Sequence, residues 1–126
     1  MTKIFNHSAH KRLWKWLAEN PTKSKWHWPE WKGNGGIFSR VEADCFACDC
    51  TARCHINSAA CPLIWPLNGE GQLLCTNGGL WDEWDNIESC YSEDEIENMS
   101  DEDKAERTRL ALLIMNLPVK DGIKYV

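Results

Sequence analysis

Five of the seven cysteines in this 126-residue chain lie within the seventeen residues from Cys45 to Cys61. The first residues, Met1 to His7, lack the apolar core of a signal peptide, so we expect the host cytoplasm as the location. In that reducing compartment, clustered cysteines bind metal more often than they form disulfides. An odd number of cysteines also excludes complete pairing within one chain. The cysteine cluster therefore predicts a core organised by a metal ion.

Cys45 and Cys48 are separated by two residues, so both thiolates can point at one ion. Such a pair needs further ligands later in the chain. Cys61 is the favoured third ligand, because the proline after it stiffens the turn. Cys75, followed by Thr-Asn-Gly-Gly, is the favoured fourth ligand, and Cys54 is the alternative.

All-thiolate tetrahedral sites suit zinc, so we predict a structural zinc ion, with an iron–sulfur cluster as the alternative. The predicted ligands are Cys45, Cys48, Cys61 and Cys75. Whether one ion or two is bound stays open.

The rest of the chain favours one small α+β domain, mostly helix and loop, around this zinc site. A helix is predicted over about 8–20, with Ser8 as a candidate N-cap and Asn20-Pro21 as the stop. The cysteine-rich metal core covers about 45–81, and an acidic helical segment covers about 82–117. Short strands are expected at 37–41 and in the tail 119–126. No apolar run approaches the length of a membrane span, so we expect no membrane partner.

Ser100 is the candidate N-cap of the last helix, because Asp101, Glu102 and Asp103 suit the positive end of a helix dipole. Leu110, Leu113, Ile114 and Leu117 follow at helical spacing. With Leu112 and Met115, this helix is apolar on most sides, so we expect it to be largely buried.

Eight tryptophans are far more than a chain of this length usually carries. Most of them are expected in the core. Trp26, Trp28 and Trp31 lie in a basic, glycine-rich loop and are the best candidates for an interface.

Charge is unevenly distributed along the chain. Residues 1–32 carry seven Lys or Arg against two acids, and residues 82–106 carry twelve Asp or Glu against Lys104. Helix capping explains the acids after Ser100, but not those before it. We predict that the earlier acids bind a partner by imitating the phosphates of DNA, and the alternative is a solvated face. They are Asp82, Glu83, Asp85, Glu88, Glu93, Asp94, Glu95 and Glu97.

The net charge of -5 disfavours direct binding to nucleic acid, and the chain carries none of the common catalytic motifs. The four histidines are scattered and are expected at the surface or at caps. His55, beside Cys54, is the histidine with a conceivable metal role. We therefore expect a binding protein and no enzyme.

Several motifs together resemble those of small cysteine-containing proteins from phages and prophages of Gram-positive bacteria. They are His10-x2-Leu13-Trp14-x-Trp16-Leu17-x2-Asn20-Pro21, Trp28-Pro29-x-Trp31, Cys45-Phe46-x-Cys48, Cys61-Pro62-Leu63-x-Trp65 and Cys75-x2-Gly78-Gly79-Leu80-x3-Trp84. The phage pattern has a second Cys-x2-Cys that ends at Cys61, and here Ser58 stands in its first place. Cys54 or Cys75 must then complete the site.

Within that group, the chain is similar in type to zinc-binding anti-CRISPR proteins of streptococcal phages. The resemblance implies binding to a type II CRISPR effector nuclease and a block of target DNA loading. A zinc-ribbon-like module that binds nucleic acid or a host transcription or replication protein, through the basic stretch Lys11 to Lys32, is the alternative. A thiol-redox protein comes third.

Overall fold

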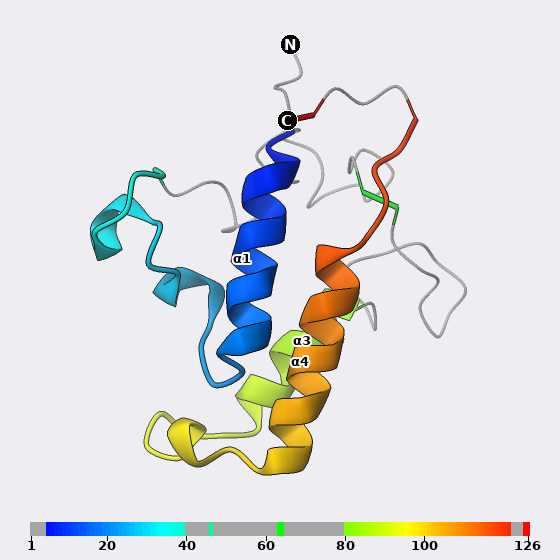
Figure 1. Cartoon of the computed structure of the whole chain (residues 1–126). Helices are drawn as coiled ribbons and strands as arrows, with labels where there is room; N and C mark the ends of the chain where they lie inside the picture. The colour runs from blue at the N-terminus through cyan, green and yellow to red at the C-terminus, as the bar shows by residue number, and fades with distance from the viewer. Residues whose placement is uncertain (1–4, 40–45, 47–62, 65–79, 122–124) are drawn as a thin grey trace.

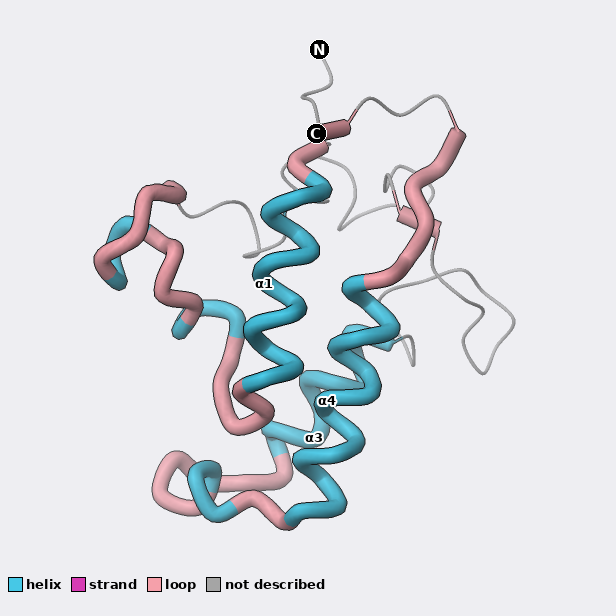
Figure 2. The backbone as a smooth tube through the Cα atoms, viewed as in Figure 1, coloured by secondary structure: helices cyan, strands magenta, loops and turns pink. Residues whose placement is uncertain are grey.

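The computed structural model describes residues 5–39, 46, 63–64, 80–121 and 125–126. This part of the chain is mostly helical, with α1 (His7–Glu19), α3 (Leu80–Ser89) and α4 (Asp101–Met115). Three short 3-10 turns, η1 (Lys25–His27), η2 (Lys32–Asn34) and η5 (Ile96–Asn98), lie in the connections. Helices α1 and α4 run side by side, and α3 packs against α4 (Figure 1; Figure 2). Nearly all of the predicted metal core, 45–81, lies outside the described residues.

Helix α1 starts at His7, one residue before the predicted range of about 8–20. Asn6, and not Ser8, is its N-cap, because the Asn6 side chain accepts a hydrogen bond from the backbone N–H of Ala9 at 3.0 Å. Ser8 lies within the first turn and is exposed. The predicted stop is confirmed: the helix ends at Glu19, and Asn20 caps it.

Helix α4 begins as predicted, because Ser100 accepts a hydrogen bond from the N–H of Asp103 at 3.1 Å. Its buried residues recur every three or four positions: Arg107, Leu110, Ala111 and Ile114. The expectation that this helix is largely buried is wrong. Leu112 and Leu113 are 40% and 43% exposed, since only one side of α4 faces the other helices.

The core lies where α1, α3 and α4 meet. Leu13 and Leu17 of α1 and Leu110 and Ile114 of α4 are almost fully buried in it. The rings of Trp84, from α3, and Trp14 pack edge to face with 5.0 Å between centroids. Burying side chains of this size supplies most of the stabilisation of such a small domain.

A second aromatic group links the segment after η1 to the cysteine-rich region. Trp28 and Trp31 are each 1% exposed and pack with Phe38 and Phe46. Phe46 is the residue that follows Cys45 in the sequence. Two of the three tryptophans predicted as interface candidates therefore belong to the core.

A tight turn between Trp31 and Phe38 brings two members of this aromatic group together. The turn brings Phe38 back to Trp31 in an isolated β-bridge, and Lys32 N–H donates to Phe38 O at 2.7 Å. Gly36 approaches Glu30 so closely that a Cβ would lie 2.2 Å from the Glu30 backbone. The strand predicted at 37–41 is reduced to this bridge in its described residues, 37–39.

The end of the chain contacts the start of α1. Tyr125 forms an isolated bridge with Phe5, and Val119 forms one with Leu63. The tail predicted as an edge strand makes only such isolated bridges in its described residues. No helix among the described residues is long and apolar enough to cross a membrane.

Candidate partner-binding surface

The eight acidic residues predicted to bind a partner fall on two neighbouring elements. Asp82, Glu83, Asp85 and Glu88 belong to α3. The other four, Glu93, Asp94, Glu95 and Glu97, lie between α3 and α4 and are named here the acidic turn. All four side chains of the acidic turn are exposed, whereas Asp82, Asp85 and Glu88 are partly buried. The carboxylates of the acidic turn are therefore more accessible to a partner than those of Asp82, Asp85 and Glu88.

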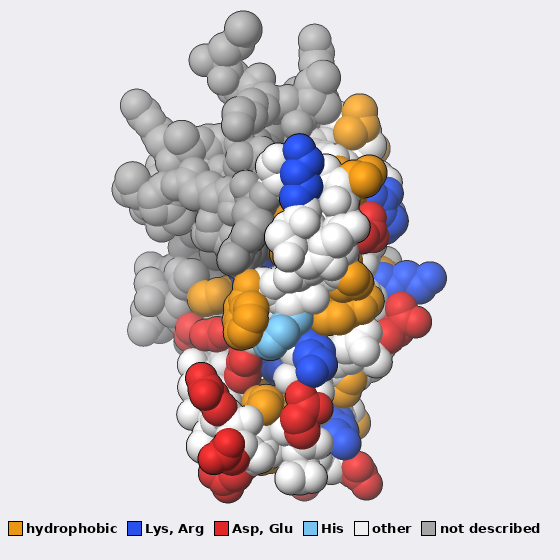
Figure 3. Space-filling model, turned by 90° about the vertical axis from the view of Figure 1, so that its left-hand side faces the viewer, with side chains coloured by type: hydrophobic (Ala, Val, Ile, Leu, Met, Phe, Trp, Pro, Cys, Tyr) orange, Lys and Arg blue, Asp and Glu red, His pale blue; other side chains and the backbone are white. Residues whose placement is uncertain are grey.

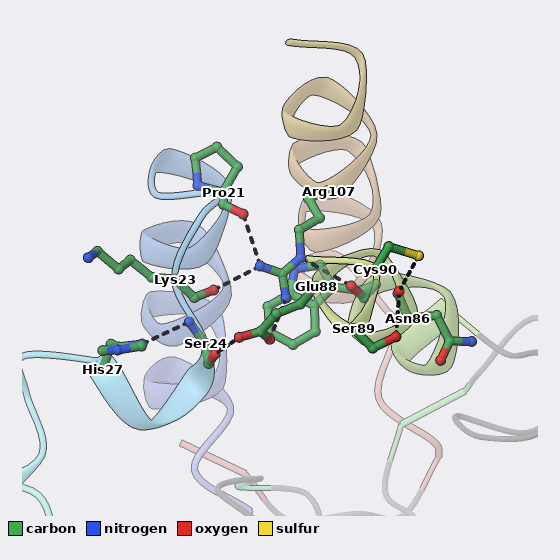
Figure 4. Close-up of polar contacts among 10 residues, drawn as sticks. Pro21, Lys23, Ser24, His27, Asn86, Glu88, Ser89, Cys90 and Arg107 are labelled. Carbon is green, nitrogen blue, oxygen red and sulfur yellow. Dashed lines mark hydrogen bonds and ion pairs between the residues drawn. The ribbon is translucent and has the colours of Figure 1, made fainter. Parts of the chain in front are cut away.

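On α3, Glu88 is engaged inside the protein. One carboxylate oxygen accepts a hydrogen bond from the Ser24 hydroxyl, and the other accepts from Arg107 at 3.1 Å (Figure 4). Burial raises the pKa of the nearby Asp85, and the negative charge of Glu88 raises it further. Both oxygens of Glu88 are thus used within the fold, and its part in the predicted partner-binding array stays a prediction.

Arg107 joins three segments of the chain. Its side chain is fully buried and donates to the carbonyl oxygen of Trp84 at 3.1 Å. It also donates to the carbonyl oxygens of Pro21 at 2.9 Å and Lys23 at 3.1 Å (Figure 4). Its guanidinium also lies 4.0 Å from the centroid of the Trp84 ring. Burial lowers the pKa of Arg107 and the charge of Glu88 opposes this, and an arginine stays protonated under such influences.

The same network holds the loop before η1 in place. The backbone N–H of Ser24 donates to His27 Nδ1 at 3.0 Å, so Nδ1 carries no proton. Burial lowers the pKa of His27, and the charge of Lys23 lowers it further. His27 thus caps η1, with Nδ1 as the hydrogen-bond acceptor.

The acidic turn is the more open part of the surface. Lys23 donates to Glu97 at 2.9 Å, which lowers the pKa of that carboxyl, and Glu95 accepts from the Ser92 hydroxyl at 2.7 Å. Glu93 and Asp94 make no hydrogen bond or ion pair with the described residues. On the face in Figure 3, acidic side chains gather at the lower end. The turn is anchored at its base, where the Tyr91 hydroxyl donates to Asp103 of α4.

Next to the acidic turn lies an exposed aromatic ring. Trp26 is 55% exposed, and its ring stacks on His27 with 3.7 Å between centroids. It is the one of the three interface-candidate tryptophans that faces solvent. A pocket of about 560 Å³ separates it from Glu93 and Glu97.

The predicted zinc ligands, Cys45, Cys48, Cys61 and Cys75, and the alternative Cys54 lie outside the described residues. Among the described residues, no three His, Cys, Asp or Glu side chains gather as a metal site would require. Cys90 is exposed and free, and its thiol donates to Asn86 O at 3.4 Å. The zinc site therefore stays a prediction.

Two buried polar residues were missed by sequence reasoning. Arg107 follows the acids at the start of α4 and precedes its leucines, and a charged side chain gives no sequence signal of a core position. His10, expected at the surface, is 2% exposed and donates from Nε2 to Ile114 O at 3.0 Å. The one available signal is its position, three residues before Leu13 on the apolar side of α1.

A scan of protein-family models, a search of curated proteins and a search of solved structures each found no match to this chain.

Proposed function

We propose that this protein is a phage anti-CRISPR protein that binds a type II CRISPR effector nuclease and blocks the loading of target DNA. The observation that carries the proposal is the exposed acidic turn, where Glu93 and Asp94 have no partner among the described residues. Carboxylates held on a turn next to a helix bundle offer an array of negative charge to a positively charged nucleic-acid channel. The choice of a type II CRISPR effector nuclease as the partner rests on the motif resemblance to phage proteins.

Zinc has a structural role in this proposal. Thiolates of Cys45, Cys48, Cys61 and Cys75 would hold the ion and order the central segment. Phe46 supports a close connection between that segment and the helical body, because it is buried against Trp28 and Trp31. The protein would inhibit by binding to the nucleic-acid channel of the effector, without catalysing a reaction.

Guided cleavage of target DNA by a type II effector, with and without this protein, tests the proposal. We expect inhibition when the protein is added before the DNA and much less when it is added afterwards, because bound DNA already fills the channel. Full cleavage with several type II effectors would refute the anti-CRISPR role.

A matched pair of charge reversals tests the acidic turn itself. Asp94→Lys and Asp121→Lys each reverse one exposed aspartate, but only Asp94 lies in the acidic turn. We expect Asp94→Lys to weaken inhibition roughly tenfold and Asp121→Lys to leave it unchanged, since like charges in an interface are strongly unfavourable. Equal inhibition by both variants, with unchanged circular dichroism, would remove the phosphate-imitating role of the turn.

The zinc-ribbon-like module receives less support from the fold. In the basic stretch Lys11 to Lys32, Arg12 pairs with Glu30 and Lys23 pairs with Glu97. Trp28 and Trp31 are buried, so they offer no face for stacking on bases. A salt-sensitive gel shift of DNA by the isolated protein would restore this alternative.

A further inference from the structure

The pocket beside the acidic turn has an aromatic wall and an acidic wall. Its aromatic wall is formed by Trp26 with His27, and its acidic wall includes Glu88, Glu93 and Glu97. The two walls come from segments about seventy residues apart in the sequence. The Arg107 and Ser24 contacts to Glu88 hold these segments together.

The indole of Trp26 is held as a platform. One face of the ring is covered by His27, whose own orientation is set by the Ser24 N–H. The backbone of Trp26 is also fixed, because Asn34 Nδ2 donates to its carbonyl oxygen at 2.9 Å. Yet more than half of the residue remains exposed. A preorganised ring of this kind can accept a flat group with little loss of entropy.

The charges around the pocket favour a cation. Glu88 and Glu97 each contact one internal cation, Arg107 and Lys23, so these two pairs are close to neutral. Glu93 adds a negative charge that no described residue compensates. An anion would be repelled here, whereas a cation would be attracted both by the carboxylate and by the face of the indole.

We propose that this pocket binds an arginine side chain of a protein partner, with the guanidinium stacked on Trp26 and hydrogen-bonded to Glu93. A guanidinium is planar and weakly hydrated, so it stacks on an indole and still donates hydrogen bonds in its own plane, which an ammonium group does not. This inference extends the proposed function, because the pocket adjoins the acidic turn that would face the basic channel.

A titration of the full-length, ¹⁵N-labelled protein with a short peptide tests this site without any nuclease. The probe is acetyl-Gly-Arg-Gly-amide, and its controls replace the arginine by lysine or by citrulline, which has the shape of arginine without the charge. We expect the arginine peptide to shift the Trp26 indole N–H signal in a saturable way, the lysine peptide to act more weakly and the citrulline peptide to have no effect.

Two variants with matched controls complete the experiment. Binding to the variants is followed through backbone amide signals, because Trp26→Leu removes the indole N–H. Trp26→Leu and Glu93→Gln should each weaken binding about two- to fivefold, as expected for one exposed cation–π contact or one surface ion pair. Asp94→Asn, which removes a neighbouring charge that does not line the pocket, should change it less. Equal shifts from the citrulline peptide, or shifts that leave the Trp26 signal unmoved, would overturn the site. Because no effector is present, that result would leave the cleavage test of the proposed function unaffected.

Discussion

Arg107 is a charged side chain with 0% exposure, and Glu88 is its one ion-pair partner among the described residues. Such a group is stable inside a protein only when hydrogen bonds replace its lost water. Here three carbonyl oxygens and one carboxylate do so. The residue therefore connects α3, α4 and the loop that carries Lys23.

Replacing Arg107 by methionine should destabilise the protein by about 3–5 kcal/mol, because the partly buried Glu88 would lose its ion-pair partner and three carbonyl groups would lose a hydrogen-bond donor. Urea unfolding measures the change. Arg109→Met is the control, since Arg109 is exposed and its hydrogen bonds and ion pair go to Glu106, and we expect little change from it. Similar unfolding midpoints for the two variants would contradict the proposed role of Arg107.

His10 should make stability depend on pH. Burial lowers the pKa of His10 from 6.5 to about 4, although the hydrogen bond to Ile114 opposes this. Between these values the unfolded chain binds a proton that the folded protein does not. The free energy of unfolding should therefore fall as the pH is lowered through this window, by about 3 kcal/mol in total.

The variant His10→Gln isolates this contribution, because an amide can still donate to Ile114 O but does not titrate. The stability difference between the natural protein and the variant should shrink as the pH falls from 7 to 4, as measured by urea unfolding. Parallel pH curves for the two proteins would show that His10 is not responsible.

At the scale of elements, the pairing of α1 with α4 decides which side of each helix is covered. The spacing of apolar residues predicts both helices, and Ser100 marks the start of α4. The spacing does not tell which of several leucines faces α1, because Leu110, Leu112 and Leu113 are close neighbours on an apolar helix. Leu110 is buried at the contact, and the other two point outward.

Leu110→Ala should therefore cost about 2–4 kcal/mol of stability, since it removes buried methyl groups and leaves a cavity. Leu112→Ala, on the exposed side of the same helix, should cost less than about 1 kcal/mol. Thermal or urea unfolding compares the two. Equal losses would mean that another part of the protein covers Leu112.

For the whole molecule, the main prediction is a zinc ion that the chain needs to fold completely. Purified protein should contain zinc by elemental analysis, and a strong chelator should lower its unfolding midpoint, because metal binding and folding are coupled. Cys45→Ser should lose the zinc. Cys90→Ser is the matched control, because Cys90 is an exposed free cysteine and should not affect the zinc content.

The same measurement distinguishes the two candidates for the fourth ligand. Loss of zinc in Cys75→Ser but not in Cys54→Ser would assign Cys75, and the reverse result would assign Cys54. Unchanged zinc in both variants, or no zinc in the natural protein, would rule out the predicted ligand set.

Local features of the sequence determined the two long helices, the stop at Asn20 and the cap at Ser100, because each depends on residues within about one helical turn. They also determined the separation of a basic first part from an acidic later part. The tertiary structure decided which of these charges face solvent. Glu88 and Arg107 are nineteen residues apart, and Lys23 and Glu97 are seventy-four apart, so their pairing depends on how the helices pack. For the same reason, only the packed structure separates buried Trp28 and Trp31 from exposed Trp26, since all three share one loop and one local chemistry.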